Sequence, residues 1–234
     1  MSQAEGDARE SLSVGEVREA GRGRVYLLVY DSKDYTGLAS SLFDELSKSN
    51  RCLLFRSSFI SDESWEGDVV QFLRVIEENA LRHFSIIAFG GASTLAQYVA
   101  LKNSKNVRSL VLVDGSCRPH PSWMQRLIDR AERRLPLGLP LRRNHPGFDG
   151  MPYLHRVRCP VLLVVSSLAS PYQSEQAEYM RRNLATAWLY RLEGSLRAES
   201  LVEALEVFQT LPVKCPQKNV TKQRLAENLK AGNV

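Results

Sequence analysis

The sequence contains no apolar run close to the ~18 residues that a membrane-spanning helix requires. It has four cysteines but no CxxC pair, so we expect neither a disulfide framework nor a zinc site. Its four histidines show no HxxxH or HxH spacing, and no bound metal is therefore predicted. A GxGxxG motif and a Walker lysine are also absent, which argues against a dinucleotide or nucleoside triphosphate. We expect no cofactor.

The first residues, MSQAEGDARESLSVGEVREAGRGR, contain no apolar segment of the kind found in secretory signals. We therefore expect a cytoplasmic protein whose cysteines stay reduced and buried. The net charge of +5 and the pI of about 9.1 are weak evidence for an anionic partner. Nucleic-acid binding is not expected, because no recognised module and no interleaving of basic and aromatic residues is present.

Apolar segments alternate with amphipathic ones along most of the chain. The apolar segments predict strands at 24–31, 51–59, 84–89, 107–115, 159–167 and 186–193. Helical periodicity falls between them, at 35–49, 64–82, 92–103, 174–185 and 199–211. This alternation predicts an α/β fold, with a mostly parallel sheet of about six strands and helices on both faces.

The chain divides into three parts. Residues 1–22 are expected to form a disordered lead-in, residues 23–213 the α/β domain, and residues 214–234 a basic, polar tail. A Pro- and Arg-rich insertion at about 116–156 is expected to form a lid. The apolar strand at 51–59 would lie at the edge of the sheet, where exposed apolar strands promote association. Either that edge binds a partner or a second copy of the chain, or residues 1–22 cover it.

The segment 84–100, FSIIAFGGASTLAQYVA, has the pattern of a nucleophile elbow: an apolar strand, a turn of small residues and a helix. In that motif a nucleophile, usually serine, lies at the turn between two small residues. Here Gly90 holds the central position, between Ala88 and Ala92. Because glycine has no side chain, it cannot attack a substrate.

Together with the strand order and the insertion after the fourth strand, this elbow resembles the α/β-hydrolase fold superfamily, in its lidded esterase/lipase-like branch. The resemblance covers about residues 24–211. The segments VRSLVLVDG and CPVLLVV are similar to the sixth and seventh strands of that fold. The family's fold begins with two further strands, which residues 1–22 are not expected to supply. The resemblance implies ester hydrolysis by a serine, a histidine and an acid.

The positions that the resemblance assigns to this triad hold residues that cannot perform its chemistry. They are Gly90 for the nucleophile, Ala169 or Ser170 for the acid, and Leu196 or Arg197 for the histidine. All three members of the triad are therefore missing, which predicts a degenerate member of the superfamily that lacks ordinary triad hydrolysis.

The loop after the first strand, which the resemblance assigns to the oxyanion site, reads Asp31-Ser32. A carboxylate at this place would repel a developing oxyanion. A ligand can still bind beyond the carboxyl ends of the strands, as in other open α/β sheets. The residues expected to contact a small apolar ligand are Asp31, Ser32, Phe89, Gly90, Gly91, Trp123 and Leu127.

Two residues are candidates for a relocated nucleophile. Ser93 lies one turn beyond Gly90, where a hydroxyl also serves to cap or pack a helix. Cys117 follows the fourth strand, between Asp114 and His120, and a thiol needs such a base nearby to be catalytic. Residues of one loop do not by themselves form a triad, so we favour structural roles for both.

The insertion is the most unusual segment, because seven arginines lie between Arg118 and Arg143 and only Asp129 and Glu132 oppose them. In PSWMQRLIDRAERRL, helical spacing separates an apolar face from a face of arginines. Such a helix can bind a membrane surface or an acidic partner, or it can be a lid whose arginines face solvent. We favour the lid. The arginines of the partner or membrane alternative are Arg126, Arg130, Arg133 and Arg134.

The sequence thus predicts a catalytically inactive α/β-hydrolase-like protein that acts by binding a protein partner, a second copy, or a small apolar ligand under the lid. Two alternatives stay open. One is an esterase or thioesterase that uses Ser93 or Cys117, and the other is a peripheral membrane or scaffold protein that acts through the basic lid helix.

Overall fold

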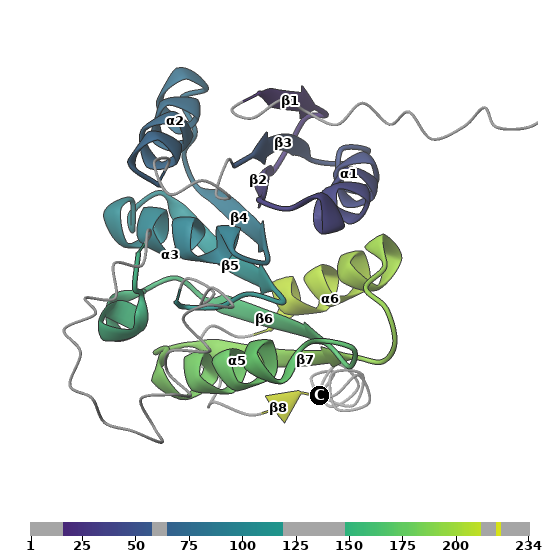
Figure 1. The fold of residues 1–234 in the computed structure, drawn as a ribbon. Coiled ribbons are helices and arrows are strands. Elements are labelled where there is room, and N and C mark those ends of the chain that lie inside the picture. Colours follow the sequence, from purple (N-terminus) through teal and green to yellow (C-terminus); the bar gives the residue numbers. More distant parts are fainter. Residues whose placement is uncertain (1–15, 58–64, 119–147, 212–218, 221–234) are drawn as a thin grey trace, which may run out of the picture.

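A computed structural model describes residues 16–57, 65–118, 148–211 and 219–220 (Figure 1). It contains an eight-stranded sheet in the order β1-β3-β2-β4-β5-β6-β7-β8. Its strands are β1 (Val17–Ala20), β2 (Val25–Tyr30), β3 (Arg51–Arg56), β4 (Phe84–Phe89), β5 (Val107–Val113), β6 (Val161–Ser166), β7 (Ala187–Leu192) and β8 (Asn219–Val220). β1 is antiparallel to β3, and every other neighbouring pair is parallel. The predicted α/β class is therefore confirmed.

Helices cover both faces of the sheet (Figure 1). One face carries α2 (Trp65–Glu78), α3 (Ala92–Lys102) and α5 (Pro171–Asn183), and the other carries α1 (Lys33–Leu46) and α6 (Ala198–Thr210). A short 3-10 helix, η1 (Met151–Arg156), contacts α5. The structure therefore has three layers, with the sheet between two layers of helices.

The two cores follow from the alternation of side chains along each strand. In β2, Leu27 and Val29 belong to the core beneath α2, α3 and α5, whereas Leu28 and Tyr30 belong to the core beneath α1 and α6. Every residue of β4 and of β6 is buried. Strands buried on both faces need apolar residues at consecutive positions, which is why the sequence shows continuous apolar runs there.

The amphipathic helix α2 shows how packing selects this layer arrangement. Its apolar positions Val69, Phe72 and Ile76 are buried, and the Phe72 ring lies 5.3 Å from the ring of Phe55 on β3, centroid to centroid. Val70 lies on the opposite side of the helix and is 56% exposed. The contrast between these positions is the signature of a helix with one face on the sheet.

We expect Phe72→Ala to lower the free energy of unfolding by about 3–5 kcal/mol, because it removes a fully buried ring and leaves a cavity. Chemical denaturation followed by circular dichroism measures this change. The matched control is Val70→Ala on the same helix, for which we expect a change within about 0.5 kcal/mol. Equal effects of the two substitutions would contradict the packing of α2 described above.

β1 corrects the expectation that residues 1–22 are a disordered lead-in. Residues 17–20 pair with β3 from Val17 opposite Phe55 to Ala20 opposite Cys52, so β3 is not at the edge of the sheet. β1 also supplies one of the two early strands that we expected to be missing. The strand is short and partly exposed, with the sequence VREA, and therefore shows no apolar alternation that a sequence pattern can detect.

Because β1 covers β3, an exposed β3 edge is no longer an argument for self-association. Residues 17–20 cover that edge, as in the alternative that residues 1–22 fold over it. At the other end of the sheet, β8 pairs with β7 through Leu189 and Tyr190. β8 lies within the segment that the sequence assigns to a polar tail, and at two residues it is too short to give a sequence signal.

The lid helix predicted within 116–156 lies mostly outside the described residues. Among the helices that are described, none combines the length and the apolar character needed to cross a membrane.

Candidate functional site

The carboxyl ends of the central parallel strands meet at one edge of the sheet, and a few polar contacts hold their loops together. The Gly90 N–H, after β4, donates to the carbonyl of Val113 at 3.0 Å. The Asp114 carboxylate, after β5, accepts a 3.0 Å hydrogen bond from the backbone N–H of Ser166 at the end of β6. The Ser166 hydroxyl donates to the carbonyl of Gly194, after β7, at 2.7 Å. This edge is where ligands bind in open α/β sheets.

Gly90 lies at a strand-to-helix turn with a φ of +56°, a left-handed conformation that disfavours side chains. It has the local form of a nucleophile elbow. A Cβ added at Gly90 would lie 2.6 Å from the edge of the Tyr35 ring and 3.3 Å from the Asp31 carboxylate oxygen Oδ1. The first of these distances is too short for two carbon atoms. The space into which a nucleophile would extend is therefore filled by Tyr35.

Tyr35, in the first turn of α1, is held in this place by contacts on two sides. Its ring lies 5.9 Å from that of Phe89, centroid to centroid. Its hydroxyl accepts a long hydrogen bond of 3.4 Å from the Gln173 side-chain amide, which also donates to the carbonyl of Asp114 at 3.2 Å. Burial raises the Tyr35 pKa, and the negative charges of Asp114 and Asp31 raise it further. Tyr35 therefore stays a neutral phenol at neutral pH.

Asp31 occupies the place from which a hydrolase would stabilise its oxyanion. In that fold the oxyanion site is made by the N–H of the residue after the nucleophile and an N–H from the loop after an early strand. The corresponding groups here are the N–H groups of Gly91 and Ser32, and both interact with the Asp31 carboxylate. Asp31 Oδ1 has no hydrogen-bond partner among the described residues. The Asp31 carboxylate thus lies near the N–H groups of Gly91 and Ser32.

Burial raises the pKa of Asp31 from its ordinary value of 3.8 to about 6, although the N–H groups of Asp31 itself, Gly91 and Ser32 oppose the rise. Burial also raises the pKa of Asp114, against the hydrogen bond from Ser166. An acid whose pKa is higher in the folded state binds protons more tightly there. Between pH 3.8 and about 6, the folded protein therefore binds more protons than the unfolded chain, and its stability falls as the pH rises.

We expect Asp31→Asn to raise the free energy of unfolding at pH 7 by about 1–3 kcal/mol, since a shift of two pKa units corresponds to about 3 kcal/mol. The advantage of the variant should shrink as the pH falls from 6 to 4, where Asp31 itself becomes neutral. Urea denaturation at several pH values measures both effects. The control is Asp44→Asn, at an exposed carboxylate paired with Arg18. An Asp31→Asn variant that is less stable at pH 7 would contradict this account.

The residues at the expected positions of the acid and the histidine cap helices or pack against the cores. Ser170 is the N-cap of α5 and forms a capping box with Gln173, in which each side chain bonds the backbone N–H of the other residue. Leu196 is partly buried and packs against the core beneath α6, and Arg197 is the exposed N-cap residue of that helix. Ala169 packs at the border of the other core.

Neither fallback nucleophile is placed for attack. Ser93 is fully buried, its hydroxyl has no partner among the described residues, and it lies against Gly115. Cys117 is also fully buried, and its thiol donates to the Gln176 side-chain oxygen at 3.1 Å. Burial raises the pKa of this thiol to about 12, so it is not a thiolate at neutral pH. Cys52 and Cys159 are likewise buried free thiols.

The ligand-contacting residues predicted from the sequence are only partly brought together. Asp31, Ser32 and Gly91 lie at the elbow and are partly accessible, but Gly90 is covered by Tyr35. The side chain of Phe89 is fully buried in the core beneath α1 and α6. The remaining predicted ligand and surface residues lie outside the described ranges; they are Trp123, Leu127, Arg126, Arg130, Arg133 and Arg134.

Two residues of the site were missed by the sequence analysis, namely Tyr35 and Gln173. Tyr35 follows Asp31 by one helical turn, which is the one local signal that could have linked them. Of the histidines, His83 lies before β4, at the other edge of the sheet, and His155 lies in η1. Within the described ranges, no cluster of His, Cys, Asp and Glu side chains could hold a metal ion.

Comparison with known proteins identifies the fold. The enol-lactonase from Burkholderia xenovorans LB400 superposes with a TM-score of 0.58 at 14% identity, covering 84% of this chain and 96% of the enzyme. The thermophilic esterase from Thermogutta terrifontis gives 0.59 at 16% identity, covering 83% and 90% of the two chains. MenH from S. aureus gives 0.59 at 11% identity, covering 83% and 99%.

This chain therefore has the α/β-hydrolase fold, as its elbow and strand order predicted. At such low identities the likeness shows the fold and says nothing about activity. No protein-family model matches the sequence, and no curated protein matches it. What the protein does must therefore be argued from its own residues.

Proposed function

We propose that this protein is a catalytically inactive member of the α/β-hydrolase fold that acts in the cytoplasm by binding a protein partner. The observation that carries the proposal is the filling of the elbow. The Tyr35 ring blocks the space above Gly90, and the Asp31 carboxylate faces the N–H groups of an oxyanion site. The buried free thiols of Cys52, Cys117 and Cys159 suit a reducing compartment.

The known losses of turnover on removing catalytic groups from hydrolases support the proposal of inactivity. Loss of one oxyanion donor lowers turnover by about 10²–10³-fold, and loss of the nucleophile by about 10⁶-fold. Here glycine replaces the nucleophile, and a carboxylate adds repulsion where charge would develop. The esterase alternative would need Ser93 or Cys117 to reach a substrate, and both side chains are fully buried.

We expect no adduct when the protein is incubated with a fluorophosphonate probe and its intact mass is measured, because glycine replaces the serine of the elbow and the Ser93 hydroxyl beyond it is fully buried. Iodoacetamide should alkylate the described cysteines slowly, since their thiols are buried and their pKa values are raised. An active serine hydrolase of the same fold is the positive control for the probe.

The variants Ser93→Ala and Cys117→Ala distinguish the outcomes. A stoichiometric adduct on the native protein that is lost in Ser93→Ala would overturn the proposal and assign a relocated nucleophile. Rapid alkylation that is lost in Cys117→Ala, together with thioesterase activity, would do the same for the thiol. Peptide mapping would identify any other labelled residue.

A protein partner is favoured over a small apolar ligand because of a wide cleft beside α3 and η1. The cleft has a volume of about 830 Å³. Aromatic rings of Tyr98, Phe148 and Tyr153 lie in sequence along it, with centroids 5.3 Å and 5.6 Å apart. Lys102 lies over the Tyr98 ring and Arg156 over the Tyr153 ring. Aromatic side chains and arginine are enriched in protein interfaces.

The charge of the cleft indicates the kind of partner. It is lined by Lys102, Arg156 and Arg158, and none of these forms an ion pair with an acidic residue in the described part of the chain. Uncompensated positive charge attracts an acidic segment, and aromatic rings supply the apolar contact. We therefore propose that the partner presents an acidic segment with apolar residues.

Poly-L-glutamate serves as a probe of this surface. We expect combined replacement of Lys102, Arg156 and Arg158 by alanine to weaken its binding at least tenfold at low salt, as measured by fluorescence anisotropy. The matched control replaces three exposed arginines elsewhere, Arg22, Arg74 and Arg82, and lowers the net charge equally. An equal loss in both variants would mean that net charge alone drives binding, and would contradict a defined surface.

A further inference from the structure

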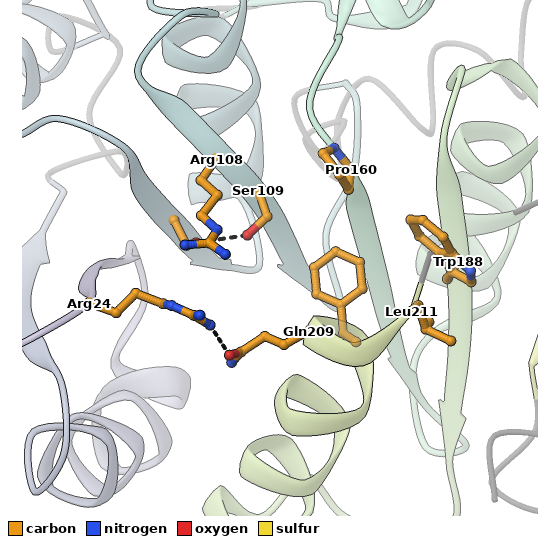
Figure 2. A pocket seen from close by; sticks show the side chains of 9 residues that line it. Arg24, Arg108, Ser109, Pro160, Trp188, Gln209 and Leu211 are labelled. Atoms are coloured by element: carbon orange, nitrogen blue, oxygen red, sulfur yellow. Dashed lines mark hydrogen bonds between the residues drawn. The ribbon is translucent and has the colours of Figure 1, made fainter. Parts of the chain in front are cut away.

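A second cavity lies at the amino ends of the parallel strands, whereas the elbow lies at their carboxyl ends. Its volume is about 230 Å³, and its lining comes from the amino ends of the strands and the end of α6 (Figure 2). Arg24 immediately precedes β2, Arg108 is the second residue of β5, and Pro160 immediately precedes β6. Ligands in open α/β sheets bind at the carboxyl ends of the strands, so this cavity is not the site of the fold's usual chemistry.

One side of the cavity is cationic. Figure 2 shows Arg24 and Arg108 on the same side, with the Arg24 guanidinium donating to the Gln209 side-chain oxygen. Gln209 in turn donates from its Nε2 to the Tyr26 hydroxyl at 2.7 Å. The positive charges of both arginines lower the pKa of Tyr26, although burial, which is the larger effect, raises it.

The arginines retain unused hydrogen-bonding capacity. A guanidinium has five N–H donors, and Gln209 takes one of those of Arg24. Neither arginine forms an ion pair with a carboxylate in the described part of the chain. The carboxyl end of α6 supplies about half a negative charge at most, which does not neutralise two cations.

The other side of the cavity is apolar. It is lined by Trp188 and Phe208, whose rings meet edge to face with centroids 5.5 Å apart, together with Pro160 and Leu211. Trp188 is 2% exposed, and its indole N–H has no hydrogen-bond partner among the described residues. A buried donor without a partner is costly. The cavity thus joins a cationic end to an aromatic wall.

We infer that this cavity binds a small organic carboxylate with an aromatic or short aliphatic body. Two arginines suit a carboxylate, because a guanidinium donates two parallel hydrogen bonds to its two oxygens. The aromatic wall accommodates the body of the ligand. The volume lies below the usual range for drug-sized ligands, so a molecule of one or two rings fits. The site goes beyond the proposed protein-binding function, from which it differs in residues and in location.

The probe for this site is 2-naphthoate, and 2-naphthalenemethanol is its neutral counterpart of similar shape. Isothermal titration calorimetry on the full chain should give a dissociation constant below about 1 mM for 2-naphthoate. The alcohol should bind at least tenfold more weakly, because it cannot pair with the arginines. Quenching of tryptophan fluorescence should accompany binding of the carboxylate, since Trp188 lines the cavity.

Arg108→Gln removes one charge and keeps a polar side chain that can donate a hydrogen bond. We expect it to weaken 2-naphthoate binding about 10–100-fold, as a charged hydrogen bond contributes about 1.5–3 kcal/mol. Arg74→Gln, at an exposed position on α2, is the matched control and should leave the affinity unchanged. Arg108 is itself exposed, so its replacement is not expected to affect folding.

Three results would overturn the inference. One is the absence of heat at millimolar 2-naphthoate, another is equal affinity for the acid and the alcohol, and the third is equal loss in Arg108→Gln and Arg74→Gln. None of them bears on the elbow, whose inactivity is tested by the fluorophosphonate probe. A failure here is therefore distinguishable from a failure of the proposed function.

Discussion

The close packing of Tyr35 over Gly90 is the contact on which the functional interpretation depends. The backbone at Gly90 keeps the left-handed turn of a nucleophile elbow, but a side chain there would collide with the ring. The ring can lie so close because glycine has no Cβ. Asp31 lies beside the same position, with its Oδ1 3.3 Å from the place of a Cβ at Gly90, and the N–H groups of Gly91 and Ser32 lower its pKa against the effect of burial. The chain thus keeps the α/β-hydrolase fold while Tyr35 fills the space beside Gly90.

Much of the fold could be predicted from the sequence, for a physical reason. A parallel sheet covered on both faces requires continuous apolar strands between amphipathic helices, and that pattern is local and strong. β1 and β8 could not be predicted, because they are short strands whose pairing depends on neighbours distant in sequence. The candidate site likewise has one part that follows from local sequence and one part that follows from tertiary packing. The missing nucleophile at Gly90 could be read from a local motif, whereas the positions of Tyr35 and Gln173 follow from tertiary packing.

The cleft beside α3, the cavity at Arg24 and Arg108, and the elbow lie at three different places on one domain. The cleft beside α3 combines aromatic rings with cations on the outside of one helical layer. The cavity at Arg24 and Arg108 lies at the amino ends of the strands, whereas the elbow lies at their carboxyl ends. Each surface draws on loops or helix ends that can vary while the two cores stay intact. The two cavities and the elbow therefore lie at separate places on one domain.

The covered elbow also limits how this chain can change over generations. A single replacement of Gly90 by serine would meet both the Tyr35 ring and an unfavourable backbone angle, so it would lower stability without giving a free hydroxyl. A smaller residue at position 35 would first have to open the space, and that change alone would leave a void beside Phe89. Each of the two replacements is therefore unfavourable without the other, and the packing of Tyr35 keeps glycine at position 90.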